Sequence, residues 1–215
     1  QYNLDLIRHF LQQRNQAPVE PNPPYLAFDD ALLVAVRGDT AGQLGINPAK
    51  PWLMVHCGTG GSANNLSLQQ YATLILGLQQ HYPDYPCVLT AGPGEGEMAA
   101  ALATLVQQGG GHASIYHSRE GLPRFCQVIA NAALFIAGST GPLHIAAALD
   151  VPTVGFFPAR RSATPLRWQP LNSEGRHLAI AAPTVGDGQN MHLISMTETL
   201  PRVHAWFAAL QPAAE

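Results

Sequence analysis

The stretch Leu134–Phe157, LFIAGSTGPLHIAAALDVPTVGFF, contains the pattern that decides the fold. It predicts a short apolar strand, a tight turn, an apolar helix from about Pro142 to Leu149, and a second apolar strand. Glycines let the turn reverse sharply, and Pro142 suits the first turn of a helix, where its missing N–H removes no hydrogen bond. Ser139 or Thr140 can cap the helix. The stretch therefore predicts a helix N-terminus at the carboxyl end of a parallel strand.

A helix end of this kind can hold an anion. Its first N–H groups lack intrahelical acceptors and the helix dipole is positive there, so a phosphate group fits well. His144 lies one turn inside the predicted helix and can point at the same anion. The stretch also fits a plain turn between two core strands, with His144 a satisfied polar residue. Both interpretations stay open at this level.

Strands and helices alternate regularly from Trp52 to Leu210. This alternation predicts the α/β class, with a parallel sheet wound on both faces. The expected strands cover residues 52–57, 86–91, 113–116, 134–137, 153–157 and 177–182. The expected helices cover residues 67–81, 95–108, 122–131, 142–149 and 197–210, with Thr197 as the cap of the last one. Ligands of such sheets bind beyond the carboxyl ends of the strands, which are the loops at 56–65, 92–97, 117–120, 138–144 and 158–168.

The first fifty residues follow another pattern. Asn3 is the expected cap of a helix that runs to Arg14, and four prolines between residues 15 and 25 indicate an extended linker or surface arm. A second helix is expected over 29–44, ending near Gly45, although the run LLVAV within it is also compatible with a strand.

Composition excludes several classes of protein. Of the 215 residues 47% are hydrophobic, which supports a sizeable core, and only 12% are charged. A net charge of −3 without a basic stripe argues against nucleic acid as a partner. No apolar run approaches the ~20 residues that a membrane-spanning helix needs. The chain begins with Gln1 and no signal peptide precedes it, so we expect a fragment or a processed form.

The three cysteines, Cys57, Cys87 and Cys126, are scattered without metal-ligand spacing. They are expected to be buried, reduced thiols of a cytosolic protein. The sequence also lacks a nucleophile elbow, a histidine pair at metal spacing and a clear carboxylate dyad. We therefore expect no complete catalytic apparatus in this chain.

The loop after the first expected strand reads HCGTGGSANNLS. Gly58, Gly60 and Gly61 can expose backbone N–H groups, and Thr59 and Ser62 add hydroxyls, so the loop suits a phosphate. A merely flexible glycine loop is the alternative.

The same loop partly mimics the dinucleotide-binding fingerprint, because Gly58, Gly60 and Ala63 have its offsets. Two features count against that fingerprint. The helix starts late, near Ser67, and the next strand offers no carboxylate at its end for a ribose. Nicotinamide binding is therefore disfavoured.

Two further loops carry candidate residues. In AGPGEGE, residues 91–97, Glu95 or Glu97 can bond a ribose diol or simply favour the first turn of the helix. In PARRSATPLRW, residues 158–168, Arg160, Arg161 and Arg167 suit a phosphate or carboxylate partner, or form a solvated basic loop.

Two of these motifs carry a resemblance to a known family. The run from Ala130 to Trp168, with STGPLHIAAALDVPTVGFF and the later LRW, and the run VHCGTGGSANNLSLQQYATL resemble the C-terminal half of the bacterial heptosyltransferases, glycosyltransferase family 9. The resemblance covers about Trp52 to Leu210. It implies a Rossmann-like domain that is the C-terminal, donor-binding half of a two-domain GT-B enzyme. Residues 51–215 then form the nucleotide-sugar-binding domain, and residues 1–50 are the remnant of the interdomain region.

The resemblance also implies the residues of the donor site. The phosphate and sugar of the donor would meet Thr59, Gly60, Gly61, Ser62, Asn64, Ser139, Thr140, Gly141, Pro142, His144, Arg160 and Arg161. Gly92 and Glu95 would lie at the nucleoside, and no metal or other cofactor is implied. Two positions depart from the family pattern. Ser139 stands where members commonly have Asp, and Asn64 where they commonly have Lys, so Arg160 or Arg161 would supply the counter-charge.

The function implied is inverting transfer of heptose from ADP-heptose to the lipopolysaccharide core, in the cytoplasm or peripherally at the inner membrane. The acceptor and the general base would belong to the N-terminal domain, so the isolated chain is expected to bind nucleotide without turnover. The alternative is a non-catalytic nucleotide-binding or structural module derived from that family.

Overall fold

The structure, a computed structural model, describes residues 2–60, 64–159, 168–186 and 188–211. The strands are β1 (Trp52–His56), β2 (Cys87–Ala91), β3 (Ser114–His117), β4 (Ala132–Gly138), β5 (Thr153–Phe157) and β6 (His177–Ala181). The α-helices are α1 (Tyr2–Gln13), α2 (Asp30–Leu44), α3 (Leu68–His81), α4 (Gly96–Gln108), α5 (Leu122–Ile129), α6 (Gly141–Ala148) and α7 (Met196–Leu210). A 3-10 helix, η1 (Met191–Leu193), precedes α7.

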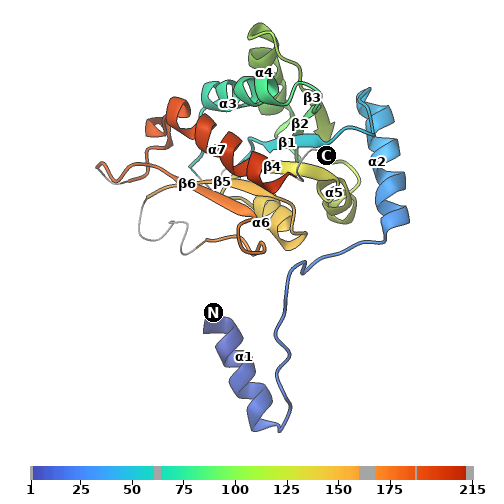
Figure 1. The fold of residues 1–215 in the computed structure, drawn as a ribbon, viewed down its shortest axis with the longest axis vertical. Helices are drawn as coiled ribbons and strands as arrows, with labels where there is room; N and C mark the ends of the chain where they lie inside the picture. The colour runs from blue at the N-terminus through green and yellow to red at the C-terminus, as the bar shows by residue number, and fades with distance from the viewer. Residues whose placement is uncertain (1, 61–63, 160–167, 187, 212–215) are drawn as a thin grey trace.

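The six strands form one parallel sheet in the order β3-β2-β1-β4-β5-β6 (Figure 1). This confirms the predicted α/β class and the Rossmann-like winding. The strand order reverses between β1 and β4, and ligands of such folds bind at the carboxyl ends of the strands beside that reversal. The sequence stretch 134–157 supplies β4, α6 and β5, as predicted.

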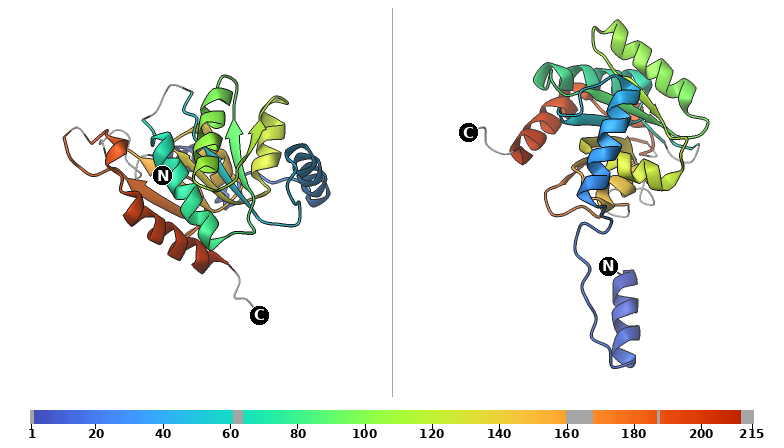
Figure 2. Two further views of the ribbon diagram at one scale, coloured as in Figure 1. Left: turned by 90° about the horizontal axis from the view of Figure 1, so that it is seen from above. Right: turned by 90° about the vertical axis from the view of Figure 1, so that its right-hand side faces the viewer.

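Helices cover both faces of the sheet (Figures 1 and 2). The helices α3, α4 and α7 pack on the face that receives Leu53 and Val55 of β1, and α2, α5 and α6 pack on the face that receives Trp52 and Met54. All five residues of β1 are buried because neither face is open to solvent. This explains why the strands read as continuous apolar runs.

The ambiguous second helix is confirmed as α2. Asp29 caps it by accepting from the N–H of Ala31 at 2.9 Å, and Gly45 ends it with a φ of 65°. Arg37 of α2 donates to main-chain carbonyls next to β1 and lies 4.5 Å above the ring of Trp52. The helix is therefore part of the folded body.

The first helix, α1, lies away from that body at the end of an extended linker (Figures 1 and 2). Its apolar Ile7 and Phe10 are 56% and 53% exposed, and Arg8 pairs with Glu20 of the linker at 2.6 Å. The helix begins at Tyr2, so Asn3 lies inside it and the predicted Asn3 cap is wrong.

Two other predicted caps can be tested. The prediction for α3 is confirmed, because Ser67 and Gln70 form a reciprocal capping box. The prediction for α7 is wrong, because Ser195 rather than Thr197 accepts from the N–H of Glu198, at 3.3 Å. The sequence offers two hydroxyl residues here, and only the backbone conformation distinguishes them.

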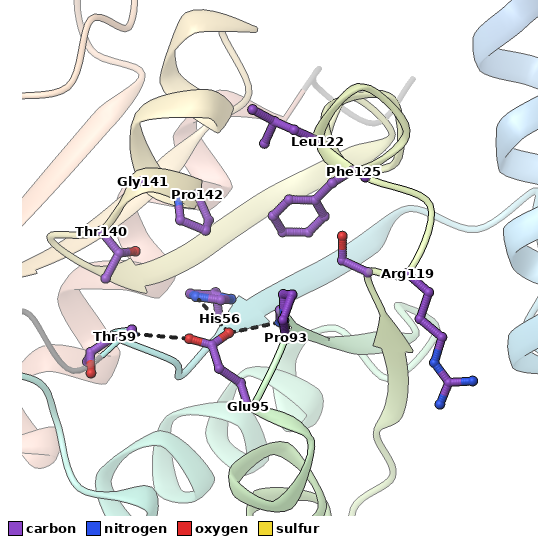
Figure 3. Close-up of a pocket in the computed structure, with 14 residues that line it drawn as sticks. His56, Thr59, Pro93, Glu95, Arg119, Leu122, Phe125, Thr140, Gly141 and Pro142 are labelled. Atoms are coloured by element: carbon purple, nitrogen blue, oxygen red, sulfur yellow. Dashed lines mark hydrogen bonds and ion pairs between the residues drawn. The ribbon is translucent and has the colours of Figure 1, made fainter.

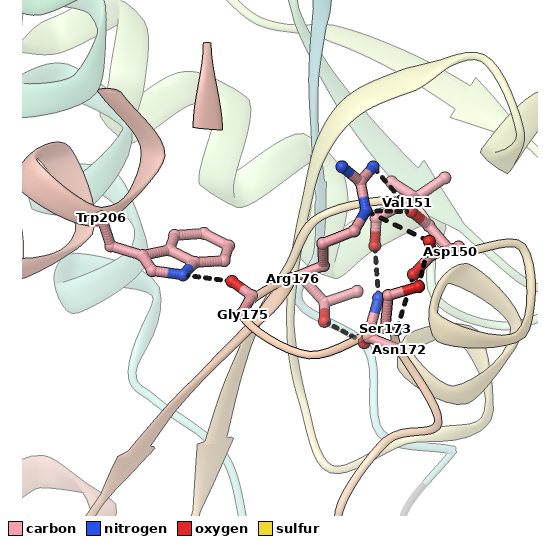
Figure 4. A network of polar contacts seen from close by, with 8 residues as sticks. Asp150, Val151, Asn172, Ser173, Gly175, Arg176 and Trp206 are labelled. Atoms are coloured by element: carbon pink, nitrogen blue, oxygen red, sulfur yellow. Dashed lines mark hydrogen bonds and ion pairs between the residues drawn. The ribbon is translucent and has the colours of Figure 1, made fainter. Parts of the chain in front are cut away.

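A polar network closes the amino ends of β5 and β6, which we name the amino rim and define as residues 150–152 and 172–176 (Figure 4). Asp150, with a left-handed φ of 57°, accepts from the N–H and the hydroxyl of Ser173 at 2.8 and 2.7 Å. Its carboxylate lies 3.3 Å from Arg176, which also donates to its carbonyl. Trp206 of α7 donates to Gly175 at 2.8 Å. The network fixes the connection between these strands.

Candidate functional site

A cavity of about 550 Å³ opens at the carboxyl ends of β1 to β4, beside the strand-order reversal (Figure 3). We name the loops around it the carboxyl rim. The first loop and the turn into α6 contribute one wall, formed by Thr59, Gly60, Thr140, Gly141 and Pro142. The loops after β2 and β3 contribute the other, formed by Gly92, Pro93, Glu95, Ser118, Arg119, Gly121, Leu122 and Phe125, while His56 also borders the cavity. Its volume is that of an ordinary small-molecule site.

The turn into α6 borders this cavity through Thr140, Gly141 and Pro142, of which Pro142 has no N–H. Thr140 is at the cap position, but its hydroxyl donates back to the carbonyl of Gly138 at 3.3 Å and makes no cap bond. No side-chain acceptor in the described part of the chain caps α6. The first amides of the helix and the positive end of its dipole are therefore available to an anion.

Glu95 joins the first and second loops of the carboxyl rim. One carboxylate oxygen accepts from the N–H of Gly60 at 3.2 Å, and the other accepts from the N–H of Gly92 at 2.8 Å. The carboxylate fills the space above Gly58, where a Cβ would lie 2.0 Å from Oε1. We name this arrangement the Glu95 clasp. It explains why residue 58 has no side chain.

His56 lies at the end of β1 beneath the clasp. The residue is 3% exposed, and its Nδ1 lies 3.2 Å from the carbonyl and 3.1 Å from the hydroxyl of Thr90 on β2. Its Nε2 lies 3.6 Å from the carboxylate of Glu95. Burial lowers the pKa of His56, while the charge of Glu95 opposes that shift.

An apolar surface lines the cavity beside the clasp. Pro93, Leu122 and Phe125 lie together in Figure 3, and the ring of Phe125 stacks on Tyr116 with 6.4 Å between centroids. Sequence reasoning missed this surface. The sequence feature that could have indicated this surface is Leu122, an apolar residue directly after a loop at a strand end. In the structure Leu122 is 62% exposed.

Arg119 was also missed. It borders the cavity from the loop after β3, and its side chain points outward in Figure 3. Within the described residues no carboxylate pairs with it.

Three predicted donor-site residues lie outside the lining of this cavity. The N–H of Ser139 donates to the carbonyl of Phe156, and the amide of Asn64 donates to the carbonyl of Gln189 at 3.3 Å. His144 is half-buried with its ring 6.4 Å from that of Trp168, and burial lowers its pKa. The predicted Gly61, Ser62, Arg160 and Arg161 lie outside the described residues. The other predicted residues, Thr59, Gly60, Gly92, Glu95, Thr140, Gly141 and Pro142, border the cavity together.

Comparison with known proteins identifies the family. Residues 14–189 match the profile of glycosyltransferase family 9 (heptosyltransferase). The chain belongs to glycosyltransferase family 9. The resemblance noted in the sequence is thereby confirmed over most of the chain.

Members and structures of family 9 resemble the chain over almost its whole length. A Haemophilus influenzae protein whose name proposes a glycosyltransferase is 47% identical over 204 residues, which are 94% of this chain and 58% of that protein. A family 9 structure from Veillonella parvula has a TM-score of 0.74 at 13% identity, over 95% of this chain and 60% of that one. The ADP-heptose heptosyltransferase II of E. coli has a TM-score of 0.68 at 20% identity, over 89% and 54%. The chain thus spans little more than half the length of these relatives.

Three other features of the described residues bear on the function. Cys57, Cys87 and Cys126 are buried and free, as predicted, and burial raises the pKa of Cys57 to about 11. In the described ranges no group of three or more potential metal ligands comes together. In the same ranges, none of the helices is both long and apolar enough to cross a bilayer.

Proposed function

We propose that this family 9 chain is the donor-binding domain of a heptosyltransferase-like, inverting glycosyltransferase of lipopolysaccharide core synthesis. Its ligand is ADP-heptose or another nucleotide-diphosphate sugar. The observation that carries the proposal is the cavity at the strand-order reversal, which joins the uncapped amides of α6 to an apolar surface. A nucleoside diphosphate has matching parts, an anionic diphosphate and a flat apolar base.

The diphosphate is assigned to the turn at Thr140, Gly141 and Pro142. Amides at a helix N-terminus stabilise the ligand and also the negative charge that develops on a leaving diphosphate. Thr59 and Gly60 face this turn from the first loop of the rim. In this assignment Arg160 and Arg161 supply counter-charge to the phosphates, since Asn64 is neutral.

The nucleoside is assigned to the opposite wall. The base would lie against Pro93, Leu122 and Phe125, where it loses contact with water. Glu95 is the described carboxylate that borders the cavity, and ionised carboxylate oxygens accept from a ribose diol. Gly92 lets the backbone approach the nucleoside.

Transfer needs a general base as well as a donor site. We assign the base and the lipopolysaccharide acceptor to an N-terminal domain of the same protein, with residues 1–50 as the interdomain segment and residues 51–215 as the donor domain. The isolated chain then binds the donor and does not turn it over. The whole protein would act at the cytoplasmic side of the inner membrane.

Calorimetric titration with ADP and UDP tests the donor assignment. Leu122→Ser removes an exposed apolar contact from the cavity, and Leu171→Ser is the matched control, because Leu171 is 60% exposed at a distant loop. We expect ADP binding to weaken about 3- to 10-fold in the first variant and to stay unchanged in the second. Absence of ADP binding by the wild-type chain would contradict the proposal.

A non-catalytic module is the second candidate. It is favoured by Asn64, which bonds to Gln189 instead of supplying a charged side chain to the cavity. Sugar transfer by the full-length protein from ADP-heptose to a core acceptor would reject the module. Nucleotide binding without transfer by that same protein would favour it.

A further inference from the structure

His56 has a hydrogen-bond acceptor at each ring nitrogen. Nδ1 faces the carbonyl and hydroxyl oxygens of Thr90, and Nε2 faces the carboxylate of Glu95. A neutral imidazole carries only one N–H, so a single proton cannot serve both carbonyl and carboxylate. The environment of His56 therefore decides where that proton lies.

For the neutral ring the Thr90 carbonyl, at 3.2 Å, favours a proton on Nδ1, whereas the Thr90 hydroxyl and the Glu95 carboxylate together favour a proton on Nε2. At 3.1 Å the hydroxyl can donate to an unprotonated Nδ1, which leaves the proton on Nε2, facing Glu95. The opposite tautomer would place the lone pair of Nε2 against the carboxylate, which is repulsive. Because the side chain of His56 is only 4% exposed, water relieves that repulsion little.

The clasp fixes Glu95 from its other sides. The N–H groups of Gly60 and Gly92 each bond one carboxylate oxygen, and Gly58 leaves the space that the carboxylate occupies. The 3.6 Å between Nε2 and Oε2 is longer than a hydrogen bond, and such contacts tighten when a ligand binds.

We infer that His56, with its tautomer set by the Thr90 hydroxyl, is a positioning residue that turns the Glu95 carboxylate toward the ribose of the donor. This inference rests on the proposed function. His56 also borders the cavity, but this role requires no contact of its own with the ligand. His56 acts through Glu95, so its loss removes selectivity for the ribose hydroxyls and leaves the rest of the binding energy in place.

The test compares the affinities of ADP and 2′-deoxy-ADP in wild type and His56→Leu. One hydrogen bond to a carboxylate corresponds to about a tenfold preference of the wild type for ADP. In His56→Leu the preference falls below about threefold, because the affinity for ADP falls more than the affinity for 2′-deoxy-ADP, and His56→Gln, which retains an N–H donor, recovers part of the preference. His112→Leu, at an exposed position, is the control. An unchanged preference in His56→Leu overturns the inference, whereas a wild type that binds neither nucleotide contradicts the proposed function instead.

A spectroscopic measurement needs neither ligand nor a destabilised variant. Ring ¹⁵N shifts of wild-type His56 should show a protonated Nε2 and an unprotonated Nδ1 at neutral pH. Thr90→Val should move the proton to Nδ1, and Thr73→Val, on exposed α3 surface, should leave it in place. A wild-type proton on Nδ1 alone would overturn the inference.

Discussion

The polar groups at the two rims of the sheet differ in whether they find partners within the protein. At the amino rim, Asp150 accepts hydrogen bonds from Ser173 and pairs with Arg176, so these polar side chains satisfy one another. At the carboxyl rim, glycines replace side chains, and the amides of α6 face a cavity. Polar groups that bond to one another stabilise the fold, and polar groups left without such partners are available to a ligand.

Helix capping shows a related contrast. Away from the cavity α3 and α7 are capped by the hydroxyls of Ser67 and Ser195, but at the carboxyl rim the Thr140 hydroxyl leaves α6 uncapped. All three helices begin with a hydroxyl residue. The difference is one of backbone and side-chain conformation. The starts of α4 and α5, which also border the cavity, likewise lack side-chain caps among the described residues, so the helix starts at the cavity share this feature.

The largest expected effect is a loss of stability when Asp150 of the amino rim is replaced. Asp150→Ala removes the acceptor of Ser173 and Arg176 and leaves a residue less suited to a positive φ. We expect the free energy of unfolding to fall by about 3 kcal/mol in urea titration, with the affinity for ADP unchanged in the folded protein. A parallel loss of affinity would show that the rims are not independent.

The next largest effect is the pH dependence of stability that arises from His177 at the start of β6. Burial lowers its pKa to about 4 from an ordinary 6.5, so between these values the unfolded chain takes up a proton that the folded chain refuses. Stability should therefore fall as pH drops from 6.5 to 4, by about 2 kcal/mol after allowance for partial exposure. In His177→Asn this part of the decline disappears, which urea titrations at pH 7 and pH 4 would measure. An equal decline in both proteins would contradict the assignment.

A smaller effect, on the affinity for ADP, is expected when Gly58, which lies under the Glu95 clasp, is replaced. Gly58→Ala places a Cβ where the Glu95 carboxylate lies, so the carboxylate must leave Gly60 and Gly92. ADP affinity should fall about tenfold by calorimetry. Gly42→Ala is the control, because a Cβ there meets nothing within 4 Å. Full affinity in Gly58→Ala would mean that the clasp has no part in binding.

The smallest effect is the difference in stability loss between replacing Ser195 and replacing Thr197 at the start of α7. Ser195→Ala removes the cap and should cost about 1 kcal/mol of unfolding free energy, whereas Thr197→Ala should cost only a few tenths. Thermal or urea unfolding of both variants measures the difference. The reverse order would restore Thr197 as the cap.

Local patterns predicted most of this fold. The apolar runs became β1 to β6 within a few residues of their expected bounds, because buried parallel strands and amphipathic helices have distinct periodicities. The N-terminal helix was located correctly, but its apolar stripe finds no covering partner in the described chain. Periodicity predicts a helix and cannot say what the helix packs against.

The candidate site was harder to predict, because its contacts join residues distant in sequence. Glu95 was singled out from the sequence, and the structure places it at the cavity, but its bond to Gly60 depends on a neighbouring loop 35 residues away. Asn64 belongs to the first loop, part of which borders the cavity, but its side chain bonds to Gln189, 125 residues later. Phe125 was not singled out from the sequence, since only the tertiary structure brings it to the cavity.

Amide NMR during titration with ADP tests the central claim most directly, because it reports on both rims at once. The account predicts that the signals of Gly60, Gly92 and Gly141 shift with added ADP, while those of Ser173, Gly175 and Arg176 stay in place. Shifts confined to the amino rim, or no shifts at saturating ADP, would contradict it.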